Sequence, residues 1–153
     1  MYQFNRKEYE ERMKWYQDAR FGMFIHWGLY SIPARGEWVR STEEMPEEEY
    51  LPFMKEFDAR DYNPKQWAKE AKAAGMKYVV LTAKHHDGFC MFDSKYTDFS
   101  IANGPFANNP KKDVARYVFD AFRQKDFMIG YLAPFAVSNS GSQRSKEEKV
   151  KRL

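Results

Sequence analysis

The feature that most constrains the fold is an alternation of short apolar runs with amphipathic helical segments. Apolar runs at residues 22–29, 78–82 and 128–134 predict strands, because buried parallel strands read as continuous apolar stretches. Between them, helical spacing of apolar residues predicts helices over residues 63–75 and 113–125. The segments after the strands are much longer than those after the helices. This order predicts an α/β fold whose long loops follow the carboxyl ends of parallel strands.

The number of strand–helix units sets the expected architecture. The chain of 153 residues supplies about three such units, whereas a (β/α)8 barrel needs eight strands and about 250 residues. Both that barrel and a doubly wound sheet begin with this order of elements. As a barrel, the chain would be the N-terminal portion, with residues 1–135 forming part of one domain. Residues 136–153 are rich in Ser, Gly and Lys, and we expect a polar, disordered tail there.

Local signals mark the ends of one helix. Asn63 fits the N-cap, Pro64 the first helical position and Gly75 the position just after the last turn. An amphipathic helix is also predicted over residues 5–19, and a short helix around residues 46–57.

Composition and charge exclude several classes of protein. The net charge is +3, and the basic excess lies in the last ten residues rather than along an aromatic-rich face, so we expect no nucleic-acid partner. No apolar run approaches the roughly 18–20 residues of a membrane span. The first residues lack the apolar region of a signal peptide, which indicates a cytoplasmic chain or one supplied without its leader. A single cysteine, Cys90, excludes an internal disulfide framework.

All three histidines lie where a predicted strand gives way to its loop. His26 falls in the first apolar run, and His85 and His86 follow the second. Active sites of parallel α/β folds are built at such strand ends. Three interpretations stay open: packed core histidines, a zinc site with three imidazole ligands, or imidazoles that bind the hydroxyls of a sugar. Neighbouring residues on a strand point to opposite faces, which argues against His85 and His86 sharing one ion.

Aromatic and acidic residues accompany the histidines. Trp27, Trp38 and Phe89 offer flat faces for the C–H edges of a sugar ring. Glu37, in the sequence Gly-Glu-Trp, is either a substrate contact or a solvated loop charge. Asp87 is followed by glycine, an ordinary turn signal, and we favour a structural role for it.

Two long motifs combine these residues in a recognisable order. FGMFIHWGLYSIPARGEW at residues 21–38 and AAGMKYVVLTAKHHDGFCMFDSKYTDFS at residues 73–100 resemble the amino-terminal half of family 29 α-L-fucosidases. The resemblance covers roughly residues 10–130. It implies a retaining exo-glycosidase that hydrolyses terminal α-L-fucose from glycoconjugates, with a (β/α)8 catalytic domain.

The resemblance also implies which residues contact the sugar. Trp27 would shape the pocket wall. In the third strand the family has a pocket tyrosine, and here Tyr131 or Leu132 takes that position, depending on whether Gly130 is aligned with the family glycine. The residues implied to hydrogen-bond or stack against fucose are His26, Glu37, Trp38, His85 and His86, with Tyr131 as a further candidate.

The catalytic carboxyls of such an enzyme are not expected in this chain. A retaining glycosidase needs two carboxyl groups about 5–5.5 Å apart. The family nucleophile follows the fourth strand and the acid/base comes later, so we expect a truncated chain that is inactive alone. The alternatives are a non-catalytic carbohydrate-binding or complementation fragment, or a zinc hydrolase that uses the three histidines. The expected partners are a fucosylated glycan or fucoside and the missing carboxy-terminal half or a second copy, and no cofactor or metal is expected.

Overall fold

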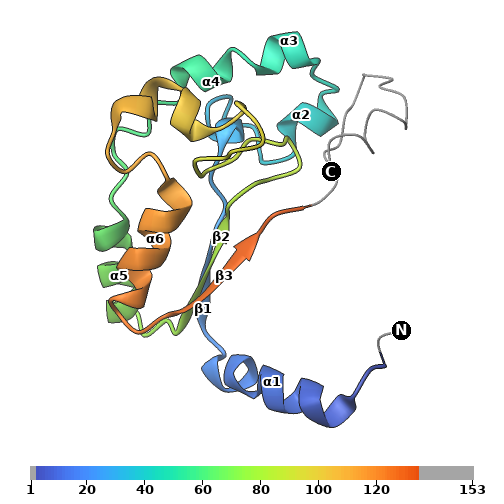
Figure 1. Ribbon diagram of the computed structural model, residues 1–153, viewed down its shortest axis with the longest axis vertical. Coiled ribbons are helices and arrows are strands. Elements are labelled where there is room, and N and C mark those ends of the chain that lie inside the picture. The colour runs from blue at the N-terminus through green and yellow to red at the C-terminus, as the bar shows by residue number, and fades with distance from the viewer. Residues whose placement is uncertain (1–2, 135–153) are drawn as a thin grey trace.

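The computed structural model describes residues 3–134 and is built on a three-stranded parallel sheet (Figure 1). Its strands, β1 (Gly22–Ile25), β2 (Tyr78–Thr82) and β3 (Met128–Leu132), lie side by side in chain order. The predicted α/β class with parallel strands is therefore confirmed. The tail expected at residues 136–153 lies outside the described residues.

Two helices cover one face of this sheet (Figure 1). They are α5 (Pro64–Ala73) and α6 (Val114–Arg123), each of which links consecutive strands. Both begin as their sequence predicts: the Asn63 side chain accepts a hydrogen bond from the Gln66 amide at 3.1 Å, and Asp113 caps α6 in the same way. Apolar side chains of the two helices and of β2 form the buried core, which includes Ala68, Ala71, Val79, Leu81, Val118 and Phe122.

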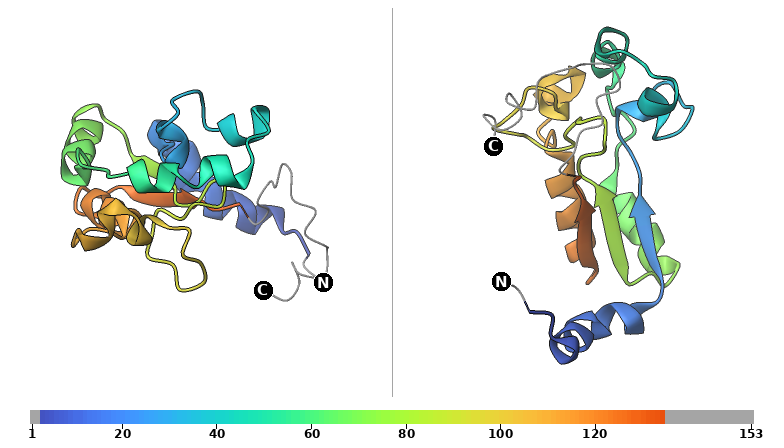
Figure 2. Two further views of the ribbon diagram at one scale, coloured as in Figure 1. Left: turned by 90° about the horizontal axis from the view of Figure 1, so that it is seen from above. Right: turned by 90° about the vertical axis from the view of Figure 1, so that its right-hand side faces the viewer.

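The long connections gather at the carboxyl end of the sheet, where they carry short helices (Figures 1 and 2). After β1 these are η1 (Leu29–Ser31), α2 (Val39–Thr42), α3 (Glu47–Tyr50) and α4 (Phe53–Glu56), and after β2 they are η2 (Ile101–Asn103) and η3 (Pro105–Asn108). The single helix predicted around residues 46–57 is thus two helices. Pro52 explains the break, since it has no amide proton to continue the hydrogen-bond ladder of α3.

The first strand differs from its prediction in length and burial. It ends at Ile25 rather than at Leu29, which instead begins the 3₁₀ helix η1. Phe24 is 52% exposed, because it points to the face of the sheet that no helix covers among the described residues. The prediction of a fully buried strand over residues 22–29 was wrong for this reason.

The helix predicted over residues 5–19 is α1 (Arg6–Ala19), which lies near the amino ends of the strands (Figure 1). No residue of α1 is buried. The rings of Trp15 and Tyr16 lie 6.3 and 5.2 Å from that of Tyr78 on β2 and tie the helix to the sheet. Within residues 3–134, no helix is long and apolar enough to span a membrane.

Candidate functional site

The three histidines meet at the carboxyl end of the sheet, although His26 lies about 60 residues before the adjacent pair His85 and His86. His26 follows β1, and its ring lies 5.6 Å from that of His85, which follows β2. The His85 and His86 rings are 4.7 Å apart. His85 and His86 are only 7% and 5% exposed, whereas His26 is exposed. The strands therefore bring together what the sequence placed at two separate sites.

The loop after β1 adds an aromatic face to this cluster. The Trp38 ring stacks on the His86 ring at 4.0 Å with an interplanar angle of 11°. Trp38 itself is 51% exposed, so one side of the indole is available to a ligand. The backbone carbonyl of Glu37 lies 2.8 Å from Nε2 of His86, which fixes the loop against the histidine. Of the predicted site residues, five therefore lie in one cluster: His26, Glu37, Trp38, His85 and His86.

One polar atom in this cluster lacks a partner. Nδ1 of His85 is buried and makes no hydrogen bond to any residue that the structure describes. Burial lowers the pKa of His85, and the neighbouring His86 lowers it further. The neutral imidazole offers one donor and one acceptor. A buried polar group without a partner costs free energy, so Nδ1 would gain from a hydrogen-bonding ligand once the side chains that cover it move aside.

The lowered pKa of His85 predicts how stability depends on pH. In the unfolded chain this imidazole titrates near its ordinary value of about 6.5. Because the folded chain binds its proton less readily, stability should fall as the pH drops through about 6.5. We expect the urea midpoint of the chain to decrease between about pH 7.5 and about pH 5.5. The variant His85→Phe cannot titrate at this position and should show a shallower decrease; an equal slope in both proteins would contradict the assignment.

The sequence did not point to Tyr30, which packs against His85 of the histidine cluster. Its buried ring lies 5.2 Å from that of His85, and its hydroxyl lies 3.3 Å from Oγ1 of Thr82. Burial raises the pKa of Tyr30 to about 12, so the hydroxyl keeps its proton at neutral pH. The available signal was its position four residues after His26, directly after the apolar run at residues 22–29.

A buried carboxylate holds the loop that carries the two adjacent histidines. Oδ2 of Asp87 accepts a hydrogen bond from the Tyr50 hydroxyl at 2.7 Å, and Oδ1 accepts one from the Phe89 amide at 3.1 Å. Nη1 of Arg40 donates to the backbone carbonyl of Asp87 at 3.0 Å. Burial, with Asp87 beside it, raises the pKa of Tyr50 well above its usual range. These contacts give Asp87 the structural role that the sequence favoured.

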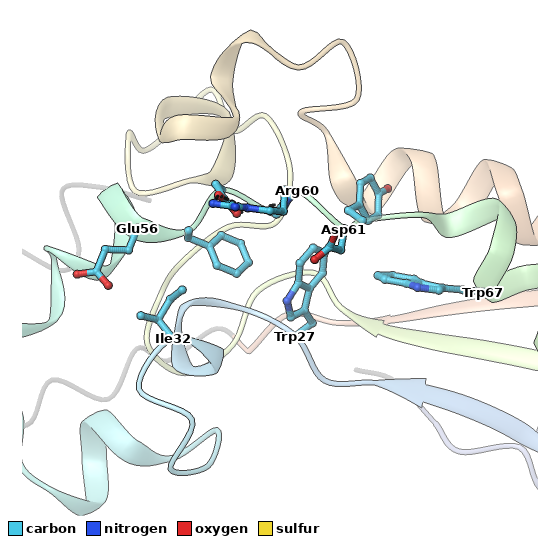
Figure 3. Close-up of a pocket in the computed structure, with 10 residues that line it drawn as sticks. Trp27, Ile32, Glu56, Arg60, Asp61 and Trp67 are labelled. Carbon is cyan, nitrogen blue, oxygen red and sulfur yellow. Dashed lines mark hydrogen bonds and ion pairs between the residues drawn. The ribbon is translucent and has the colours of Figure 1, made fainter.

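Trp27 lies on the other side of β1, facing the helices. Its ring packs 5.7 Å from those of both Tyr62 and Trp67 and 5.3 Å from that of Phe57. It lines two pockets of about 400 and 420 Å³; the second is also lined by His26, and neither is lined by His85 or His86. Figure 3 shows Trp27 in the wall of the first pocket, between Ile32 and Trp67. The Trp27 ring therefore packs against Phe57, Tyr62 and Trp67 rather than against the rings of His85 and His86, although it shares the second pocket with His26.

Tyr131 is also not brought to the histidines. It pairs in register with Leu81, and its ring lies 6.5 Å from that of Phe119 on α6. Side chains alternate along a strand, so Leu132, the register partner of Thr82, shares the side that faces Tyr30. The alignment that places Leu132 at the family tyrosine position is the one this geometry fits.

The described residues hold no group of three or more His, Cys, Asp or Glu side chains arranged to bind a metal ion. The zinc interpretation therefore gains no support from the geometry.

Comparisons with known proteins assign the family. The family model described as α-L-fucosidase matches residues 1–150. The chain belongs to the α-L-fucosidase family. A putative α-L-fucosidase of Caenorhabditis elegans is 36% identical in an alignment of length 139 that covers 79% of this chain and 28% of the worm protein. Tissue α-L-fucosidase of Rattus norvegicus is 44% identical over 97 residues, covering 53% of this chain and 21% of the rat protein.

Solved structures of α-L-fucosidases share the fold. Isoenzyme 1 from Paenibacillus thiaminolyticus superposes with a TM-score of 0.75 and 54% identity over 80% of this chain and 28% of that chain. A family 29 α-L-fucosidase from Bacteroides thetaiotaomicron, described as a trapped covalent intermediate, gives a TM-score of 0.71 and 37% identity over 79% of this chain and 29% of its own. The parallel sheet thus resembles the N-terminal region of these fucosidases, and the chain spans less than a third of their length.

Proposed function

We propose that this chain forms the fucose-binding side of an α-L-fucosidase active site. The observation that carries the proposal concerns Nδ1 of His85, which has no hydrogen-bond partner within residues 3–134 and is buried among the rings of His26, Tyr30, His86 and Trp38. A sugar hydroxyl would supply the missing hydrogen bond, and an aromatic face beside it suits the apolar edge of a deoxy sugar.

Each residue of the cluster has a role in this proposal. The three imidazoles bind hydroxyls of a terminal α-L-fucose, and the exposed face of Trp38 stacks on the ring. The Glu37 carboxylate contacts a further hydroxyl. The family membership and the fucosidase structures with ligands support this substrate class.

The bond-breaking step requires groups from elsewhere. A retaining glycosidase places two carboxyls about 5–5.5 Å apart, one as nucleophile and one as acid/base. At this site Asp87 is occupied by Tyr50 and Phe89, and we assign Glu37 to binding. We therefore propose that both catalytic carboxyls belong to the part of the related fucosidases that this chain does not span, and that this chain alone is inactive.

The sheet itself supports a place within a (β/α)8 barrel. Residues 1–135 would form its first strand–helix units, with residues 136–153 outside them. Phe24 and Met128 expose apolar surface on the uncovered face, as expected of a barrel interior that further strands would close. The 420 Å³ pocket beside β1, between Ile25 and Trp67, would take a helix of the remaining units.

Calorimetry with L-fucose tests the binding proposal, with D-fucose as the matched control sugar. We expect saturable binding of L-fucose alone, and equal heats for both sugars would overturn the proposal. A second experiment tests whether the catalytic carboxyls lie outside this chain. The chain is mixed with the remaining part of a related fucosidase, and hydrolysis of 4-nitrophenyl α-L-fucoside is assayed. We expect turnover only in the mixture, and turnover by this chain alone would show that it contains the catalytic pair.

A further inference from the structure

We propose that the hydroxyl of Thr82, together with the Tyr30 hydroxyl that contacts it, positions His26 and His85 relative to each other. The contacts are properties of the unliganded chain. Only the consequence for sugar binding rests on the proposed function.

Oγ1 of Thr82 lies at the junction of the first two strands and contacts four polar groups. It accepts a hydrogen bond from the Trp27 amide at 3.1 Å. The carbonyls of Ile25 and Trp27 each lie 3.3 Å away, and the hydroxyl of Tyr30 lies at the same distance. A hydroxyl has one proton to donate and two lone pairs to accept. It can therefore accept from Trp27 and Tyr30 while the two carbonyls share its single proton.

These contacts fix the backbone immediately before and after His26. The backbone pairing of β1 with β2 stops at Ile25, opposite Leu81. Beyond that point the Thr82 side chain holds the backbone groups on both sides of His26, namely those of Ile25 and Trp27. The direction in which the His26 side chain leaves the backbone is thus set by a residue of the neighbouring strand.

The same hydroxyl reaches the other histidine through Tyr30. Thr82 is 99% buried and lies three residues before His85 in the chain. The Tyr30 ring packs 5.2 Å from the His85 ring, and its hydroxyl is anchored on Thr82. One side chain therefore connects the supports of both imidazoles, whose rings are 5.6 Å apart. Valine would fill nearly the same space without making any of these hydrogen bonds.

The test compares Thr82→Val with Thr82→Ser, which restores the hydroxyl. The matched control is Tyr62→Phe, which removes a hydrogen bond of 3.0 Å to the Val114 carbonyl, away from the histidines. In histidine-labelled protein, the nuclear Overhauser effect between the His26 and His85 rings reports their separation without any ligand. Calorimetry then measures the affinity for L-fucose.

We expect Thr82→Val to lose the His26–His85 Overhauser effect and to bind L-fucose about tenfold more weakly. Thr82→Ser and Tyr62→Phe should keep both, even where their thermal stability drops. A Thr82→Val protein with the wild-type Overhauser effect would overturn the proposal, as would a Thr82→Ser protein that behaves like Thr82→Val.

Two further outcomes also decide the question. If the wild-type chain does not bind L-fucose, the proposed function fails, and the Overhauser comparison alone judges the positioning role. If Thr82→Val does not fold, Tyr30→Phe replaces it, since this variant keeps the ring against His85 but removes the contact with Thr82. We then expect shifted His85 ring resonances, and unchanged resonances would overturn the proposal.

Discussion

Replacing His85 with phenylalanine is expected to weaken L-fucose binding by about 1–3 kcal/mol, which is roughly fivefold to 150-fold in Kd. Phenylalanine keeps an aromatic ring against Tyr30 and His86. It removes Nδ1, the buried atom that has no partner among the described residues. The sugar hydroxyl that this nitrogen would bind is then left unpaired in a largely dehydrated site. Isothermal titration calorimetry on the folded variant measures the loss directly.

A second replacement separates the hydrogen bond from the packing of the ring. His85→Ala removes both, so it should bind no better than His85→Phe and should be less stable because a cavity is left behind. Thermal unfolding followed by circular dichroism verifies that the phenylalanine variant is folded. Wild-type affinity in His85→Phe would show that His85 is a core residue rather than a sugar ligand.

Replacing Asp87 with alanine is expected to lower the free energy of unfolding by about 3 kcal/mol or more. Its carboxylate accepts hydrogen bonds from the Tyr50 hydroxyl and the Phe89 amide, and all three groups are buried. Alanine leaves both donors without a partner, at a cost of about 1–3 kcal/mol each. Urea titration followed by circular dichroism measures the change.

The control for Asp87 is an aspartate on the surface. Asp18 forms an exposed ion pair with Lys14 on α1, at 2.7 Å, and such pairs contribute little to stability. Asp18→Ala should therefore unfold close to the wild type. Asp87→Asn keeps an acceptor and should fall between the two alanine variants. Equal stability of Asp87→Ala and Asp18→Ala would contradict a structural role for the buried carboxylate.

Local signals in the sequence were sufficient for several elements. The cap at Asn63, the proline at the next position and the glycine after the last turn predicted the limits of α5 closely. Gly75 adopts a φ of +83°, a conformation that glycine reaches at little cost. The strand Tyr78–Thr82 was predicted at its observed bounds, because a short apolar run that contains three β-branched residues, Val79, Val80 and Thr82, is typical of a strand.

Features set by distant contacts could not be read in the same way. Strand β1 stops at Ile25 because the Thr82 side chain of β2 accepts the hydrogen bond of the Trp27 amide. This contact joins residues 55 positions apart in the chain. The stack of Trp38 on His86 likewise depends on how two loops meet. Tyr131 was ambiguous because a shift of one residue moves a side chain to the opposite face of a strand. The proximity of His26 and His85 could be expected from the sequence, because both follow strands whose carboxyl ends share one edge of a parallel sheet.

The network behind the histidines has a consequence for how such enzymes can be recombined. Among the residues that the structure describes, several side chains that hold the cluster in place lie between residues 22 and 91: Tyr30, Arg40, Tyr50, Thr82 and Asp87. If the cluster binds the sugar as proposed, the residues that recognise it and these supporting side chains lie in one contiguous stretch of sequence. We therefore expect that residues 22–91 could be exchanged as one segment between related fucosidases, which would change sugar binding without changing the catalytic carboxyls.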